Sequence, residues 1–236
     1  MVYYIYAALK LGAEKNSKTI DFSVPTGNFG DIFAGYVARR MLPKGTIGQL
    51  VLATNENNLL TRFVQDGDYS LGTVVHTNSP SMDIQVASNF ERYLYFLFNE
   101  DAQKTAQAMQ SFAEDGKLKF DAAQQELIRA DFTANTTSEE ETLATISDYY
   151  RDHGYILDPH TAVGVNAAST TRQPDTPMVC LATAHPAKFG EAVNKAIGRD
   201  PKMPASFTDL EKRPARCEII DAKVESVRDY LAKNAL

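Results

Sequence analysis

The chain has 236 residues, of which 44% are hydrophobic and 23% are charged, and its formal net charge at pH 7 is −6. This composition is typical of a soluble globular protein. The negative charge argues against a non-specific nucleic-acid binder, and no apolar run approaches the roughly 20 residues needed to cross a bilayer. The two cysteines, Cys180 and Cys217, are too few for a disulfide framework, so we expect a cytoplasmic protein without nucleic-acid or membrane partners.

The first hundred residues predict strands that alternate with helices. Apolar stretches at 20–24 and 48–54 are typical of buried strands in a parallel sheet, and 72–76 is a third candidate strand. Helical periodicity is expected over 2–12, 30–41, 57–64 and 88–98. Because alternating strands and helices form βαβ units, we expect an α/β fold with a mainly parallel sheet.

The strand signal weakens after residue 100. Helices are expected over 102–112, 137–150, 160–168 and 191–197, and from about residue 222. A last core strand is expected at 176–183, where Pro177 precedes an apolar run. We therefore expect a mainly helical segment over 101–175, followed over 176–236 by the last core strand and a C-terminal tail.

The turn at 24–31, Val-Pro-Thr-Gly-Asn-Phe-Gly-Asp, joins the first strand to a helix. Free N–H groups and the positive end of the helix dipole converge at such a turn and make an anion site. Gly27 and Gly30 allow the backbone to approach a phosphate closely. The turn lacks the lysine of a P-loop and the spacing of the dinucleotide fingerprint. From the residues alone, a phosphate site and an ordinary strand–turn–helix connection both stay open.

Long motifs along nearly the whole chain resemble segments of the threonine synthases, pyridoxal-phosphate enzymes of fold type II. In order, they are PTGNFGDIFAGYVARRM from Pro25, LVLATNENNLL from Leu50, SPSMDI from Ser79, SNFERYLYFL from Ser88, LDPHTAVG from Leu157 and LATAHPAKFGEAV from Leu181. The resemblance implies a three-layer α/β/α fold like that of the tryptophan synthase β-subunit. It makes 1–100 the cofactor-phosphate region, 101–175 a mainly helical insertion, and 176–236 the last core strand, the cofactor-ring contact and the tail.

The resemblance is to the C-terminal part of the family's catalytic domain, so the fold is expected to be incomplete. The family's Schiff-base lysine stands in a Ser-Phe-Lys-Asp motif, which these 236 residues lack. We therefore expect the chain to be inactive alone, with the N-terminal half of the same protein as its missing partner. The intact protein is expected to be a monomer or a homodimer.

The implied activity is that of a lyase in threonine biosynthesis. It converts O-phosphohomoserine and water to L-threonine and phosphate, with pyridoxal 5′-phosphate as the cofactor. Two alternatives stay open: a threonine-synthase-like phospho-lyase that eliminates phosphate without adding water at the β-carbon, and a non-catalytic phosphate-binding module.

The resemblance also assigns cofactor contacts. The phosphate is expected to bind Gly27, Asn28, Phe29, Gly30 and Asp31, mainly through backbone amides. Thr183 ends the last core strand and lies at the carboxyl edge of the sheet, where ligands bind in open α/β folds. Its hydroxyl is expected to face the pyridine nitrogen. The alternative is that Thr183 caps the helix that follows.

Six further residues are candidates for substrate binding: Ser79, Ser81, Asp83, Asn89, Arg92 and His160. The first three surround Pro80 at an expected helix start, where capping is the simpler interpretation. Arg92 is suited to a bidentate phosphate contact, although a surface arginine fits equally well. His160 and His185 can titrate near neutrality, but a lone histidine is more often structural. No spacing of histidines and acids predicts a metal site.

Overall fold

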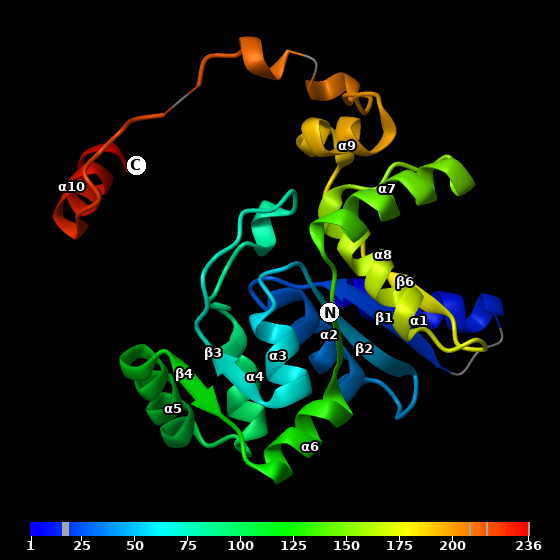
Figure 1. Cartoon of the computed structure of the whole chain (residues 1–236). Helices are drawn as coiled ribbons and strands as arrows, with labels where there is room; N and C mark the ends of the chain where they lie inside the picture. Colours follow the sequence, from blue (N-terminus) through cyan, green and yellow to red (C-terminus); the bar gives the residue numbers. More distant parts are fainter. Residues whose placement is uncertain (16–18, 208, 216, 236) are drawn as a thin grey trace. The chain divides into compact units, whose positions relative to one another are not determined.

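A parallel sheet of four strands, in the order β5-β2-β1-β6, organises the first of two compact units, Met1–Pro201 (Figure 1). The computed structural model describes residues 1–15, 19–207, 209–215 and 217–235. The strands of this sheet are β1 (Ile20–Pro25), β2 (Ile47–Thr54), β5 (Thr133–Thr136) and β6 (Met178–Cys180). All three pairings are parallel, which confirms the parallel α/β fold expected from the sequence.

One face of the sheet packs against the helices that precede and follow β1 and β2. These helices are α1 (Val2–Lys15), α2 (Gly30–Met41), α3 (Leu59–Asp66) and α4 (Phe90–Leu97). Alternate strand residues, such as Phe22 in β1 and Leu50 and Leu52 in β2, are fully buried against them. This alternation is the period-two pattern of a strand, and it places the larger apolar cluster on this face.

Helix α8 (Pro159–Thr171) covers the opposite face, so the unit has three layers (Figure 1). Val51 and Ala53, which alternate with the residues of the first face, pack there against Val163 and Ala167. Gly164 allows close contact, since a Cβ there would lie 3.0 Å from the Pro25 ring. Helices α7 (Glu139–His153) and α9 (Gly190–Ile197) contact each other, and α7 also packs on α8.

Capping residues set the helix boundaries in the middle of the chain. Ser138 forms a capping box with Glu141 at the start of α7, as the run of acids there predicts. Asp121 does the same with Gln124 for α6 (Ala122–Asp131). Helix α5 (Ala102–Asp115) ends at Gly116, which has a φ of 68°. Most helix positions expected from the sequence are therefore confirmed, while α6 was not expected.

Two strand predictions were wrong. No strand forms at 72–76, because the side chain of Asn57 takes both backbone hydrogen bonds of Val75: the Val75 N–H donates to Oδ1 over 2.9 Å, and Nδ2 donates to the Val75 carbonyl over 2.8 Å. The strand signal also did not end at residue 100, since β5 extends the sheet beyond β2. A separate antiparallel pair joins β3 (Asp68–Ser70) to β4 (Lys117–Lys119).

The second compact unit spans Lys202–Leu236. It contains two short 3₁₀ turns, at Ala205–Phe207 and Leu210–Lys212, and helix α10 (Val224–Asn234), which confirms the expected final helix. No helix in the described ranges is long and apolar enough to cross a membrane. The division at residues 100 and 175 stays a prediction.

Gly35 in α2 provides a test of how α1 packs. A Cβ at Gly35 would lie 2.6 Å from the ring of Tyr4, which is 1% exposed and whose hydroxyl donates to the Asp31 carbonyl over 2.9 Å. We expect Gly35→Ala to lower the free energy of unfolding by about 1–3 kcal/mol, because overpacking outweighs the gain of about 1 kcal/mol in helix propensity. The measurement is chemical denaturation of the two proteins.

The matched control is Gly190→Ala, at the start of α9. A Cβ there would approach only Pro201, at 4.0 Å, so this variant should be neutral or slightly more stable. Equal effects of the two substitutions would contradict the packing of α1 on α2.

Candidate functional site

The carboxyl ends of the parallel strands meet at one edge of the sheet, and the sequence motifs converge there. The turn after β1 begins at Thr26, Asn55 follows β2, Thr137 follows β5, and Thr183 lies shortly after β6. Ligands bind at this edge in open α/β sheets. We therefore place the candidate site at the carboxyl edge.

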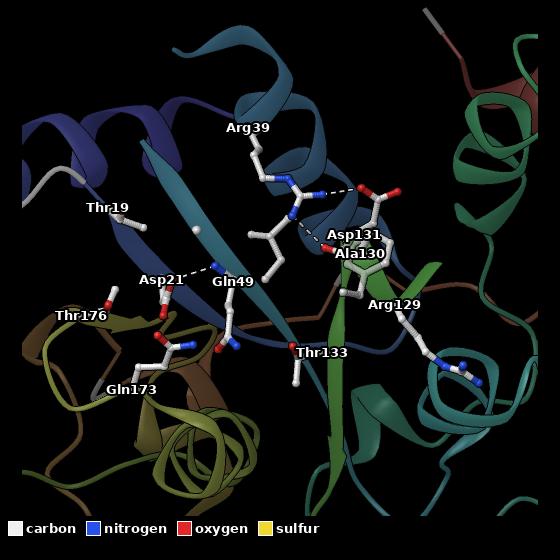
Figure 2. A pocket seen from close by; sticks show the side chains of 13 residues that line it. Thr19, Asp21, Arg39, Gln49, Arg129, Ala130, Asp131, Thr133, Gln173 and Thr176 are labelled. Carbon is white, nitrogen blue, oxygen red and sulfur yellow. Dashed lines mark hydrogen bonds and ion pairs between the residues drawn. The ribbon is translucent and has the colours of Figure 1, made fainter. Parts of the chain in front are cut away.

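A hollow of about 370 Å³ lies at the opposite edge, where the strands begin (Figure 2). Asp21, Gln49 and Gln173 gather there. The Gln49 N–H donates to Asp21 Oδ1 over 2.7 Å, at the point where the register of β1 against β2 shifts. Gly48 leaves the room for this carboxylate. The Asp21 carboxylate thus accepts a hydrogen bond that a backbone carbonyl would accept in a regular ladder. We therefore assign Asp21 a structural role at this bulge.

The turn between β1 and α2 presents a set of unused donors. Across the described residues, the backbone N–H groups of Gly27, Asn28, Phe29 and Asp31 donate no hydrogen bond, whereas the Gly30 N–H donates to Asn28 Oδ1 over 2.9 Å. Helix α2 is 12 residues long, so the positive end of its dipole adds to their field. This arrangement fits a phosphate-sized anion.

Phe29 determines how the turn is bent. Its φ of 67° and ψ of 0° lie in the left-handed region, which is unusual for a residue with a side chain. The ring is fully buried, with its centroid 5.5 Å from that of Phe90, 5.8 Å from that of Tyr93 and 5.6 Å from that of Phe132. The aromatic cluster therefore holds Phe29 while its N–H is left to the site.

Asn89 fixes the other side of the turn. Its backbone N–H and its Nδ2 both donate to the Asn28 carbonyl, over 3.0 and 3.1 Å. A Cβ at Gly30 would lie 3.0 Å from Asn28 Oδ1 and 3.1 Å from Asn89 Nδ2. The predicted site residues Asn28, Gly30 and Asn89 therefore lie together, and Gly30 leaves no room for a larger side chain.

Asp31 contributes in a different way from its neighbours. The hydroxyl of Tyr4 donates to both its carbonyl and its carboxylate, over 2.9 and 3.1 Å. The carboxylate is thus held by α1, and what Asp31 offers to an anion is its backbone N–H.

Ser79 and Asp83 belong to a polar network beneath the loop that follows β3. Asn55 Nδ2 donates to Ser79 Oγ over 3.0 Å and to Asp83 Oδ1 over 2.8 Å. Asn57 Nδ2 donates to the same carboxylate over 3.1 Å, and Thr77 donates to it from its N–H and its hydroxyl. Since Ser79 is 1% exposed and both Asp83 oxygens accept, these two side chains hold the loop in place.

Ser81 approaches the turn through its backbone. A Cβ at Gly27 would lie 2.8 Å from the Ser81 carbonyl oxygen and 3.2 Å from the Met82 Cα, so only glycine fits there. The Ser81 N–H donates to His160 Nε2 over 3.2 Å. The structure therefore brings Ser81, Gly27 and His160 together, and His160 contacts the loop.

Thr183 was expected to end the last core strand over 176–183, which was wrong, since β6 ends at Cys180. Its side chain is exposed at the carboxyl edge, and its N–H donates to Thr161 Oγ1 over 3.2 Å. The following 3₁₀ turn (Pro186–Phe189) is capped by His185, whose Nδ1 accepts from the Ala187 N–H over 3.1 Å. The capping alternative for Thr183 is therefore wrong, because His185 fills that position. The ring contact stays a prediction.

Arg92 is joined to the site residues through its backbone N–H, which donates to the Asn89 carbonyl over 3.2 Å. It is exposed and lines a shallow hollow with Phe33, Glu91, Tyr95 and Phe96. The side chain of Asn89 is bound to the Asn28 carbonyl. Substrate contacts by Asn89 and Arg92 stay predictions.

Sequence reasoning missed Asn55, Asp158 and Thr161. Asn55 directly follows a buried strand, which is a signal that could have been used. Asp158 stands one residue before Pro159 at the start of α8, a position typical of an N-cap. No group of three histidines, cysteines or acids suited to a metal ion occurs among the described residues.

The chain is similar to threonine synthases along nearly its whole length. Residues 161–231 match a family model described as threonine synthase, C-terminal. The chain is 45% identical to the threonine synthase of Pseudomonas aeruginosa over 99% of this chain and 50% of that protein. It is 42% identical to that of Saccharomyces cerevisiae over 84% of this chain and 41% of that protein.

The crystal structure of a PLP-bound threonine synthase from Brucella melitensis matches with a TM-score of 0.89 at 44% identity, covering 98% of this chain and 49% of that one. The likeness to a fold type II threonine synthase supports the three-layer fold expected from the motifs. The chain spans about half the length of the curated relatives it matches.

The ionisation of Asp158 predicts how the free energy of unfolding changes at acidic pH. Burial opposes ionisation, but hydrogen bonds from His160 and Thr161 outweigh it and hold the pKa of this carboxyl below its usual range. A carboxyl with a lowered folded-state pKa stabilises the protein above its unfolded-state pKa of about 3.9, and this contribution is lost as the pH falls through the folded value.

We therefore expect Asp158→Asn to destabilise the protein most near neutral pH, with the difference in unfolding free energy shrinking as the pH falls below about 4. Urea denaturation of both proteins across this range provides the measurement. A difference that stays constant or grows on acidification would show that the Asp158 charge does not stabilise the fold.

Proposed function

The chain belongs to the threonine synthase family, and we propose that it is the part of a pyridoxal-phosphate-dependent threonine synthase that holds the cofactor phosphate and faces the cofactor ring nitrogen. The proposed overall reaction converts O-phosphohomoserine and water to L-threonine and phosphate. One observation carries the proposal: among the described residues, four backbone N–H groups at the start of α2 donate no hydrogen bond, in a turn whose two glycines admit no side chain. This donor set suits a phosphate dianion.

The backbone amides of Gly27, Asn28, Phe29 and Asp31 are assigned to bind the phosphate. They are neutral and already oriented, so binding requires little rearrangement of the chain. Asn28 uses its side chain to hold the Gly30 N–H and therefore positions the turn. Asn89 acts through its two hydrogen bonds to the Asn28 carbonyl.

Thr183 is assigned to the ring nitrogen. A neutral hydroxyl does not hold a proton on that nitrogen as a carboxylate would. When bound, pyridoxal phosphate supplies an electron sink for charge that develops on the substrate. The role of this chain is to bind and orient, and to leave the ring nitrogen without a charged partner.

The substrate is assigned to the same edge of the sheet. Ser81 is exposed and Asn89 partly exposed, and both flank the turn, so they are the substrate candidates best placed to meet it. Proton transfer on the substrate is assigned to the family's Schiff-base lysine, whose Ser-Phe-Lys-Asp motif does not occur in these 236 residues. Our proposal therefore includes a partner segment that corresponds to the other half of the relatives. The cytoplasmic location and the oligomeric state stay predictions.

Complementation tests the proposal as a whole. This chain is co-expressed with the N-terminal half of the Pseudomonas aeruginosa relative, and the purified complex is assayed for threonine from O-phosphohomoserine. We expect threonine and phosphate from the complex and neither from the chain alone. Release of 2-oxobutyrate without threonine would favour the phospho-lyase, and cofactor binding without turnover would favour the binding module.

Thr183→Val tests the ring contact in that complex. The variant keeps the side-chain shape and removes the hydroxyl, so we expect a loss of about 1–3 kcal/mol, or roughly ten- to a hundred-fold in turnover, with a shifted cofactor absorbance. Thr183→Ser keeps the hydroxyl and should retain both. Gly30→Val should instead abolish cofactor retention by displacing Asn28 and Asn89. An unchanged spectrum and turnover in Thr183→Val would exclude the ring contact.

A further inference from the structure

The start of α8 joins two distant segments of the site through one carboxylate. Asp158 caps this helix: its Oδ1 accepts from the His160 N–H over 3.0 Å and from the Thr161 N–H over 3.4 Å. It also makes two contacts that a cap does not require, one to His160 Nδ1 over 3.0 Å and one from the Thr161 hydroxyl to its Oδ2. All three residues are at most 4% exposed.

The first contact determines which ring nitrogen of His160 donates and which accepts. Because Asp158 Oδ1 accepts only when a proton lies on the ring nitrogen, Nδ1 carries the hydrogen and Nε2 presents a lone pair. The Ser81 N–H donates to that lone pair over 3.2 Å. The Ser81 carbonyl in turn occupies the space where a Gly27 side chain would lie. His160 therefore fixes the loop that flanks the phosphate turn.

The second contact determines where the Thr161 hydroxyl donates and where it accepts. Its hydroxyl has one hydrogen, which it donates to Asp158 Oδ2. A lone pair is then directed to the Thr183 N–H, which donates over 3.2 Å. The segment that carries Thr183 lies beyond the end of β6, so this hydrogen bond ties it to α8 where the sheet no longer does.

We infer that Asp158 is a positioning residue that fixes both the flank of the phosphate turn, through His160, and the segment bearing Thr183, through Thr161. The assignment of the cofactor phosphate and the ring nitrogen to these two segments rests on the proposed function. The two hydrogen-bond relays do not depend on it. His160 accordingly acts on the loop and not on substrate. The distance between phosphate and ring nitrogen is fixed in the ligand, so a shared anchor keeps the two protein segments in matching positions.

The test uses variants that separate the relays from helix capping. Asp158→Ser keeps a good N-cap but removes the second carboxylate oxygen and the contact to Nδ1. His160→Phe removes the acceptor for Ser81 and keeps a ring against Phe189, whose centroid is 4.7 Å from that of His160. Thr161→Val removes the acceptor for Thr183, and Thr161→Ser retains it.

The measurement is residue-resolved amide hydrogen exchange on the full chain, with Leu52 in β2 as the reference amide. His160→Phe should speed exchange about ten-fold at Ser81 and not at Thr183, and Thr161→Val the reverse, as expected for the loss of one hydrogen bond of about 1.4 kcal/mol. Asp158→Ser should speed both, and Thr161→Ser neither. Unchanged exchange at both amides in Asp158→Ser, or equal effects of His160→Phe and Thr161→Val at both, would overturn the inference.

A second readout addresses the ligand in the complemented complex. His160→Phe should weaken retention of pyridoxal phosphate about ten-fold, whereas Thr161→Val should shift its absorbance with little change in retention. If the variants show the selective exchange pattern but the unmodified complex binds no cofactor, the relays are established and the proposed function is refuted. Cofactor binding with no change in any of the variants would refute the positioning role and leave the proposed function intact.

Discussion

The burial of one aromatic ring in a left-handed turn is the constraint on which the site depends. Phe29 adopts a backbone conformation that costs on the order of 1–3 kcal/mol for a non-glycine residue. Full burial of such a ring contributes about 1.5–3 kcal/mol, and its edge-to-face contacts with Phe90 and Phe132 add about 0.5–1.5 kcal/mol each. The core therefore stabilises a backbone conformation that glycine would adopt more easily. Because its ring is buried, Phe29 holds the turn in place, whereas glycine has no side chain to do so.

The parallel sheet explains why residues far apart in sequence share the site. Parallel strands place all their carboxyl ends at one edge, so the turns after β1, β2 and β6 are neighbours whatever chain lies between them. Ser81 and His160 are 79 positions apart and still share a hydrogen bond. Helix α8 makes this possible because it crosses the second face of the sheet, with Gly164 close against Pro25, and begins at the same edge.

The sequence predicted features that depend on local pattern and missed those that depend on contacts across the chain. Helix α2 was expected over 30–41 and forms over those residues, because apolar spacing and the glycine turn are local signals. Strand β5 was missed because Thr133–Thr136 is short, polar and at the sheet edge, so only its partner β2 makes it a strand. Residues 72–76 have apolar and β-branched side chains, yet the amide of Asn57 holds their backbone instead of a neighbouring strand.

The same distinction applies within the site and explains the role of its buried acid. The candidate phosphate turn at 26–31 is contiguous, so its residues could be named together from the sequence. Asp158, in contrast, acts through two partners that reach different segments. The candidate donors at the turn are backbone amides, whereas Asp158, the acid that anchors the neighbouring segments, is buried at the start of α8. The Asp158 carboxylate accepts four hydrogen bonds from His160 and Thr161, and these two residues in turn hold the Ser81 and Thr183 N–H groups. The candidate anion site and its charged anchor therefore lie on different elements, the turn before α2 and the start of α8.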